Sequence, residues 1–144
     1  MKPPIDPPDL FVKDTGTAKG RGVFAKRRYA QGEVVEVAPV LLLKTDYDAL
    51  PELLKTYVFD WASLTGVPGR QALALGYGSM YNHANPANLQ YEADARAGVM
   101  RYIAARRIKA NEELTINYSG EGGAAESDHN DWFERTEIEL IPSS

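Results

Sequence analysis

The segment 81–88, YNHANPAN, gathers three asparagines and one of the chain's two histidines within eight residues. Apolar runs flank it on both sides, so many of these groups would be buried and would need hydrogen-bond partners. Taken singly, the asparagines favour an Asx turn, and the histidine is an ordinary, partly buried polar residue. The density of the cluster instead predicts that something is bound or braced there.

A second candidate is the triplet Gly20-Arg21-Gly22, which follows Lys19. Glycines two positions apart allow a tight backbone whose amide groups can face a carboxylate or a phosphate. An isolated GxG is more often only a turn. No long helix is expected after it, so the sequence does not fit the dinucleotide-binding motif.

Three aromatic residues, Tyr91, Tyr118 and Trp132, are candidates for the wall of a site. Tyr118 ends an apolar run and would ordinarily be a strand-end residue with its hydroxyl in water. Tyr91 has the same interpretation, and a tryptophan near a terminus most often fills a core. Considered one at a time, none of the three indicates chemistry.

The elements that must position these residues are predicted to be mostly strands. A strand, turn and strand are expected over 19–43, and short strands at 10–12, 72–75, 99–105 and 114–118. Apolar residues spaced three and four apart between Tyr47 and Trp61 predict one helix of two to three turns. No internal repeat is recognised. The fold class expected is therefore mainly β with short helices.

A proline-rich segment at the start of the chain and a glycine-rich one after residue 118 predict one domain over 10–118, with an arm before it and a tail after it. Residues 1–9 contain four prolines and are expected to form a stiff extended arm. The run 119–127, SGEGGAAES, predicts a flexible linker. Residues 128–144 contain an aromatic pair and are expected to dock back on the domain.

Composition narrows the classes of function. The 144 residues carry a net charge of −4, which argues against direct nucleic-acid binding. The chain has no cysteine and two histidines, which excludes thiolate chemistry and makes a metal site unexpected. No run approaches a membrane span or a signal peptide, so no membrane partner is expected. We expect an intracellular, cytoplasmic protein, with a nuclear or host-nuclear location as the alternative.

In chain order, the motifs KGRGVFA, QGEVVEV, YNHANPAN and AARRIKANEELTINY, followed by an aromatic tail, resemble the SET-domain family of protein lysine methyltransferases. The resemblance covers residues 19 to 140. Asn82-His83 with Asn88 matches the family's NHSCxPN, and the run from Glu112 to Tyr118 matches its GEELTxxY. Small bacterial or viral members, without a zinc-binding cysteine tail, are most similar in size.

The resemblance implies several small sheets with a C-terminal segment threaded in a knot-like way. It also implies S-adenosylmethionine as the cofactor and Tyr118 as the catalytic tyrosine. The residues expected to hold the cofactor are Lys19, Gly20, Arg21, Gly22, Asn82 and the backbone of His83, and we expect Trp132 to pack over the adenine. His83 is not expected to act as an acid or a base.

The substrate implied is a lysine of a protein, such as a basic, chromatin-like one. Tyr91 and Ile116 are expected to line the lysine channel and Phe133 to close it, and the hydroxyl of Tyr91 favours mono- or dimethylation. Many members carry a tyrosine where this chain has Val37, so one channel wall would lack a hydroxyl. The oligomeric state is left open.

Two alternatives remain at this point. Because Val37 replaces a tyrosine, the chain could be a SET-like module that binds a peptide or cofactor without turnover. A sheet domain that binds a small molecule or nucleotide, without transfer chemistry, is the other. Titration with S-adenosylmethionine separates binders from non-binders, and labelled cofactor with basic proteins separates enzyme from module.

Overall fold

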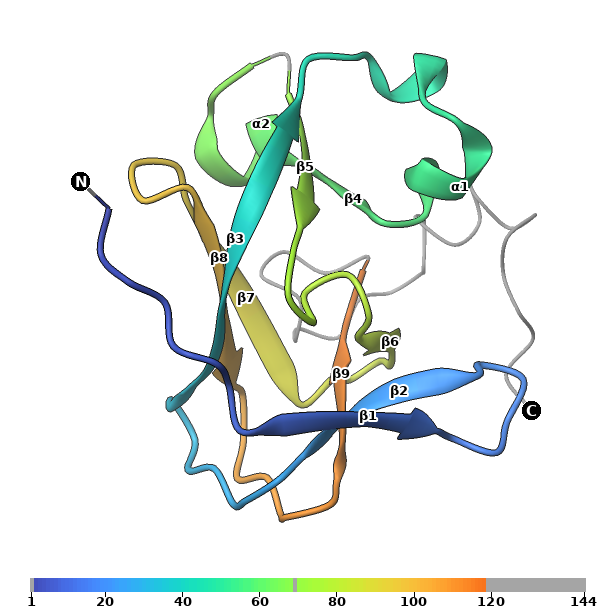
Figure 1. Ribbon diagram of the computed structural model, residues 1–144, viewed down its shortest axis with the longest axis vertical. Coiled ribbons are helices and arrows are strands. Elements are labelled where there is room, and N and C mark those ends of the chain that lie inside the picture. The colour runs from blue at the N-terminus through green and yellow to red at the C-terminus, as the bar shows by residue number, and fades with distance from the viewer. Residues whose placement is uncertain (1, 69, 119–144) are drawn as a thin grey trace.

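The computed structural model describes residues 2–68 and 70–118 of the chain. Two sheets carry most of the regular structure, and the helices are short pieces between strands (Figure 1). The prediction of a mainly β fold with short helices is confirmed. No helix in the described residues is long and apolar enough to cross a membrane.

The smaller sheet contains the residues singled out by the two motifs. Its strand order is β1-β2-β9-β6, where β1 is Leu10–Asp14, β2 is Arg21–Ala25, β9 is Glu113–Ile116 and β6 is Asn82–His83. The strand β9 pairs antiparallel with β2 and parallel with β6. One strand therefore joins the glycine motif on its first edge to the Asn-His motif on its second.

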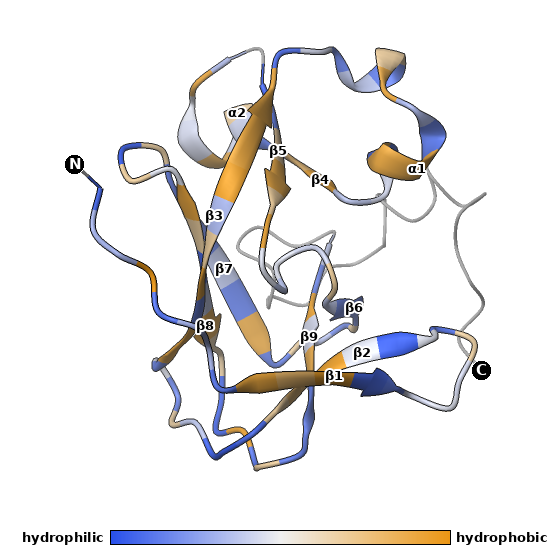
Figure 2. Ribbon diagram, viewed as in Figure 1, coloured by the Kyte–Doolittle hydropathy of each residue, from blue (hydrophilic) through white to orange (hydrophobic). Residues whose placement is uncertain are grey.

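The larger sheet supplies most of the core. Its order is β4-β5-β3-β8-β7, with β4 at Val58–Asp60, β5 at Gln71–Ala74, β3 at Val34–Leu43, β8 at Val99–Ala104 and β7 at Leu89–Asp94. All of its pairings are antiparallel. Its strands β3 and β5 are largely apolar, whereas β6 of the smaller sheet is polar (Figure 2). Alternate residues of β7 and β8, such as Tyr91 and Tyr102, are buried in the core.

The prediction of one helix between Tyr47 and Trp61 is wrong. The structure has a 3-10 turn η1 at Tyr47–Ala49, a four-residue α1 at Glu52–Lys55, the strand β4, and α2 at Trp61–Thr65. The strand β4 pairs with β5, and Asp60 then begins α2 by accepting hydrogen bonds from the backbone of Ala62 and Ser63. Apolar residues do recur at helical spacing here, but the buried ones belong to separate elements and not to one helix face. Leu53 stays 68% exposed.

The remaining strand predictions agree with the structure to within a few residues, and β1 lies at one edge of the smaller sheet. The strands β6 and β7, like β4, are additions that the sequence does not predict. The knot-like threading, the linker at 119–127 and the docking of 128–144 lie outside the described residues, so they stay predictions.

Two short turns of the chain share one pattern of hydrogen bonds, although no repeat of supersecondary size is recognised in the sequence. Residues 27–33, RRYAQGE, and 106–112, RRIKANE, form turns with the same hydrogen bonds, from arginine and from a backbone amide to the closing glutamate. A β-bridge between Tyr29 and Ile108 places the two turns side by side. The repeat is only seven residues long, which makes it hard to recognise in the sequence.

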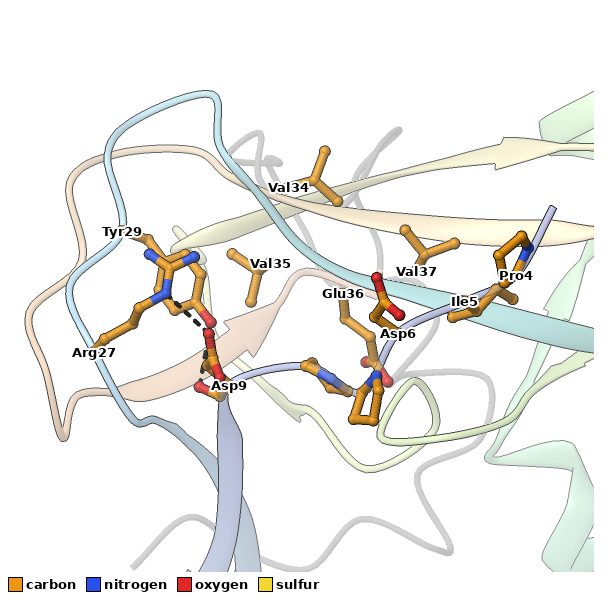
Figure 3. A pocket seen from close by; sticks show the side chains of 12 residues that line it. Pro4, Ile5, Asp6, Asp9, Arg27, Tyr29, Val34, Val35, Glu36 and Val37 are labelled. Carbon is orange, nitrogen blue, oxygen red and sulfur yellow. Dashed lines mark hydrogen bonds and ion pairs between the residues drawn. The ribbon is translucent and has the colours of Figure 1, made fainter.

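The N-terminal arm runs extended to β1 without regular structure of its own. A cavity of about 300 Å³ lies between the arm and β3, bordered by Ile5, Val34 and Val37 among others (Figure 3). Asp9 anchors the end of the arm by an ion pair to Arg27 and a backbone hydrogen bond from the Tyr29 hydroxyl. The arm is thus fixed where it enters the sheet.

Candidate active site

The two sequence motifs meet at the pairing of β6 with β9. Asn82 lies opposite Thr115 and His83 opposite Ile116, and the backbone N–H of Ala84 donates to the Ile116 carbonyl over 3.0 Å. Parallel strands of such different sequence position can pair only through a long crossover. The structure therefore brings together segments separated by about thirty residues, as the resemblance implied.

Asn82 connects the glycine motif to β9. Its Nδ2 donates to the Arg21 carbonyl at 3.2 Å and to the Glu113 carboxylate at 2.8 Å. A Cβ on Gly22 would lie 2.5 Å from Glu113 Oε2 and 3.0 Å from Asn82 Nδ2. A side chain at position 22 would therefore displace the Glu113 carboxylate and press on the Asn82 amide.

Lys19 and His83 form the next contact. Lys19 Nζ donates to the His83 carbonyl at 3.0 Å, and the backbone N–H of Tyr118 donates to His83 Nδ1 at 3.2 Å. Burial, together with the nearby Lys19 charge, lowers the pKa of His83 to about 4. The imidazole is therefore neutral at pH 7, and the expectation that it is not an acid-base catalyst stays a prediction.

Asn88 clamps the end of the cluster onto β9. Its Oδ1 accepts from the Thr115 N–H at 2.8 Å, and its Nδ2 donates to the Glu113 carbonyl at 2.7 Å. The Asn88 N–H donates to Thr115 Oγ1 at 3.2 Å. Asn88 is only 3% exposed, so these bonds satisfy groups that are out of water. The cis Asn85-Pro86 bond lies in the same loop.

Tyr118 lies just beyond β9 and points its hydroxyl back at the cluster. The phenol donates to the Tyr81 carbonyl at 2.5 Å, and its ring stacks on His83 with centroids 5.6 Å apart. Burial raises the pKa of Tyr118, and the neighbouring Tyr57 and Tyr91 raise it further. The hydroxyl is thus a protonated donor at neutral pH, suited to orienting groups and not to removing protons.

Tyr91 and Ile116 belong to the same apolar cluster as Tyr118. Tyr91 packs edge-on against Phe59 with centroids 5.3 Å apart, and burial raises its pKa to about 12. Ile116 is fully buried on β9. Both predicted channel residues are thus brought close to Tyr118, although their roles toward a substrate stay predictions.

The structure does not bring Val37 to this cluster. A β-bulge between Val34 and Glu36 changes the register of β3, so that Glu36 pairs with Tyr102 and Val37 with Arg101. Paired residues share a face of the sheet, and Tyr102 faces the core. Val37 therefore lies on the outer face under the N-terminal arm, and Figure 3 shows it leaving the strand opposite to Glu36.

Sequence reasoning misses several residues of the site. The sequence predicts Tyr57 only as one apolar residue of a helix, although in the structure its hydroxyl raises the pKa of Tyr118. Tyr81 is the first residue of the polar cluster and is not singled out in the sequence, yet its carbonyl accepts a hydrogen bond from the Tyr118 hydroxyl. Glu113 belongs to a motif, and its contact with Asn82 has no sequence signal beyond the resemblance.

Trp132 and Phe133 lie outside the described residues, so their predicted packing stays a prediction. Among residues 2–68 and 70–118, no three histidine or carboxylate side chains are placed to hold a metal ion.

Comparisons with known proteins agree with this geometry. Residues 20–119 match the SET domain family. The chain is 37% identical over 121 residues to a histone-lysine N-methyltransferase of Schizosaccharomyces pombe described as specific for H3 lysine 37, covering 82% of this chain and 78% of that protein. The chain therefore belongs to the SET-domain family of protein lysine methyltransferases.

Solved structures show the same fold at lower identity. A Plasmodium falciparum protein described as a histone methyltransferase superposes with a TM-score of 0.63 at 23% identity, covering 79% of this chain and 95% of that one. A humanized Chaetomium thermophilum Polycomb Repressive Complex 2 gives 0.62 at 22% identity, covering 78% of this chain and 15% of that one. At these identities the likeness concerns the fold alone.

Proposed function

We propose that this chain transfers a methyl group from S-adenosylmethionine to the ε-amine of a lysine in a basic, histone-like protein. The observation that carries the proposal is the convergence of Asn82-His83 and Tyr118 across the parallel pairing of β6 with β9. The specificity of the Schizosaccharomyces pombe relative for a histone lysine supports the substrate class.

The residues around the glycine motif fit the cofactor. Gly22 lets Asn82 and Glu113 lie against β2, and the backbone of Gly20, with φ of 74°, turns sharply beside Lys19 and has open space where a Cβ would be. In this proposal Lys19, Gly20, Arg21, Gly22, Asn82 and the His83 backbone would hold the cofactor. When bound, S-adenosylmethionine supplies a methyl group on a positively charged sulfur.

The chain's own residues must deliver a neutral amine and hold it in line. The pKa of a free lysine amine is about 10.4, which is about 3 pH units above neutrality. Deprotonating the amine at pH 7 therefore costs roughly 4 to 5 kcal/mol. The apolar surroundings of Tyr91 and Ile116 favour the uncharged amine. The C–S bond breaks as the N–C bond forms, and Tyr118 contributes a fixed hydroxyl and no proton transfer.

The acidic side chains Glu92, Asp94, Glu112 and Glu113 support recognition of a basic substrate only weakly, since scattered surface acids are common. The addition of one or two methyl groups, through the hydroxyl of Tyr91, stays part of the proposal. So does an intracellular location, cytoplasmic or nuclear, because S-adenosylmethionine is made and used inside cells.

The experiment is methyl transfer from labelled S-adenosylmethionine to core histones and other basic proteins, paired with calorimetric titration of the cofactor. We expect saturable binding and label on lysine. Asn82→Ala should weaken cofactor binding about tenfold or more, because two hydrogen bonds across the site are lost. Glu52→Ala, at an exposed position of α1, is the control. Binding without transfer would instead support the non-catalytic module, and no binding would overturn the proposal.

A further inference from the structure

Glu36 is the one carboxyl buried in the core among the described residues, at 3% exposure. No ion pair to it is found in that part of the chain. A buried carboxyl without a cation is costly unless hydrogen bonds compensate for the lost water. Its retention in β3, between valines, therefore calls for an explanation that packing does not provide.

Both carboxyl oxygens have partners in the segment that leads to the active site. Oε1 accepts from the Tyr81 hydroxyl at 2.6 Å, and Oε2 accepts from the Tyr77 backbone N–H at 2.8 Å. Burial raises the pKa of Glu36, and these two bonds oppose that rise, so the carboxylate depends on both donors. Glu36 therefore holds 77–81 at both of its ends.

The turn is shaped to receive this carboxyl. Gly76 adopts a φ of 62°, and a Cβ there would lie 2.6 Å from Glu36 Oε2. A hydrogen bond from the Tyr102 hydroxyl to the Gly78 carbonyl, at 3.0 Å, supports the same turn. A side chain at position 76 would displace the carboxyl, so the glycine and the glutamate form one unit.

The held segment ends at the partner of Tyr118. The Tyr81 carbonyl accepts the Tyr118 hydroxyl at 2.5 Å, and Asn82 follows directly. Tyr81 itself is 1% exposed and packs on Tyr102 with centroids 4.7 Å apart. Moving the Tyr81 ring would therefore move the carbonyl that orients the Tyr118 phenol.

We infer that Glu36 is a positioning residue for Tyr118, acting through the Tyr81 side chain and carbonyl. This inference rests on the proposed function, because it assigns Glu36 to the same reaction. The chain of contacts crosses from the larger sheet to the smaller one. It gives the protein a means of fixing the Tyr118 hydroxyl that does not involve the outward-facing Val37.

Glu36→Gln tests the inference with little change of shape. A glutamine can still accept from the Tyr77 N–H through its oxygen, but its NH2 group then faces the Tyr81 hydroxyl, which must accept and can no longer donate to a carboxylate. We expect kcat to fall about tenfold or more, with the KM for both substrates and the cofactor Kd changed by no more than about twofold. Glu52→Gln, the same change at an exposed position of α1, should match the wild type.

Tyr81→Phe is the companion variant, since it removes the hydroxyl that Glu36 accepts and keeps the backbone carbonyl. It should reproduce the loss of kcat, and the double variant should lose no more than the worse single one. A merely structural role would lower Tm and leave kcat per folded molecule unchanged, which would overturn the inference. If Glu36→Gln does not fold, the kcat of Tyr81→Phe decides between the two roles in the same way.

A measurement without turnover separates this inference from the proposed function. In protein labelled with 13C-tyrosine, the Tyr118 signal, assigned by Tyr118→Phe, should shift in Glu36→Gln, and the Tyr47 signal should not. An unshifted Tyr118 signal would overturn the inference even in an active enzyme. A wild type that transfers no methyl group would overturn the proposed function, and the Tyr118 signal would still decide the role of Glu36.

Discussion

The turns at 27–33 and 106–112 both begin with two arginines, end in glutamate and have the same internal hydrogen bonds, but they contact different parts of the molecule. In each, an arginine pairs with the closing glutamate, which also accepts a backbone N–H three residues before it. Gly32, with φ of 86°, and Asn111, with φ of 69°, occupy equivalent left-handed positions. The bridge between Tyr29 and Ile108 makes them neighbours.

The difference lies in what contacts each turn from outside. Arg27 of the first turn pairs with Asp9, an exposed residue at the end of the arm. Glu112 of the second accepts from Asn88, and the next residue, Glu113, accepts from Asn82. Both turns have the same internal structure. Only the second is connected to the active site, through hydrogen bonds from the asparagines of 82–88.

Removing the outside partner of each turn should separate the two roles most strongly. Asn88→Ala leaves the Thr115 N–H and the Glu113 carbonyl buried without their partner, so we expect the free energy of unfolding to fall by about 2 to 4 kcal/mol. Methyl transfer should fall with it. Asp9→Ala removes an exposed ion pair and should cost less than about 1 kcal/mol. Denaturant unfolding measures both, and equal losses would break the comparison.

The second turn leads to a strand that contacts a titratable imidazole, which gives a pH dependence. The pKa of His83 is about 4 in the fold and about 6.5 in an unfolded chain. The unfolded chain therefore binds the proton first, and stability falls as pH drops from 6.5 toward 4. Because His83 is only partly buried, we expect this contribution to be about 1 to 2 kcal/mol. His83→Gln should flatten that part of the curve, and an unchanged slope would contradict the assignment.

The left-handed residue of each turn offers a smaller test. Gly32→Ala should lower the free energy of unfolding by about 1 kcal/mol, because alanine disfavours a positive φ. Gly32→Asn should cost about half of that, since Asn111 shows that asparagine fits the same turn. Thermal unfolding of both variants checks the order. A larger loss for asparagine than for alanine would show that the two turns are not equivalent.

The smallest effect is expected for the closing glutamate of the first turn. Glu33→Gln weakens an ion pair whose side chains are 46% and 37% exposed, so the loss should be about 0.5 kcal/mol. Methyl transfer should stay as in the wild type. Glu112→Gln, the matched change in the second turn, should lower methyl transfer measurably. Equal activities would mean that Glu112 does not support the site.

Much of the site is predictable because its residues lie in contiguous motifs. Asn82, His83 and Tyr118 are candidates from the sequence, and the structure brings them together across β6 and β9. Strands such as β1 and β8 follow from short β-branched runs between turns. The resemblance, and not the residue pattern alone, predicts that the two motifs converge.

The rest depends on tertiary contacts that leave no local pattern. The bulge in β3 exchanges the faces of Glu36 and Val37, and nothing in VVEV marks its position. The spacing between Tyr47 and Trp61 is helical, but pairing of β4 with β5 overrides it. Cofactor use, the lysine target and cellular location stay predictions.

Methyl transfer by Tyr118→Phe tests the central claim most directly. With labelled S-adenosylmethionine and core histones, the wild type should methylate lysine, and the variant should lose about a hundredfold or more in kcat while its cofactor Kd changes little. Tyr47→Phe, which removes a hydroxyl bonded to the Lys55 carbonyl, is the control and should keep full activity. Undiminished transfer by Tyr118→Phe would contradict the account.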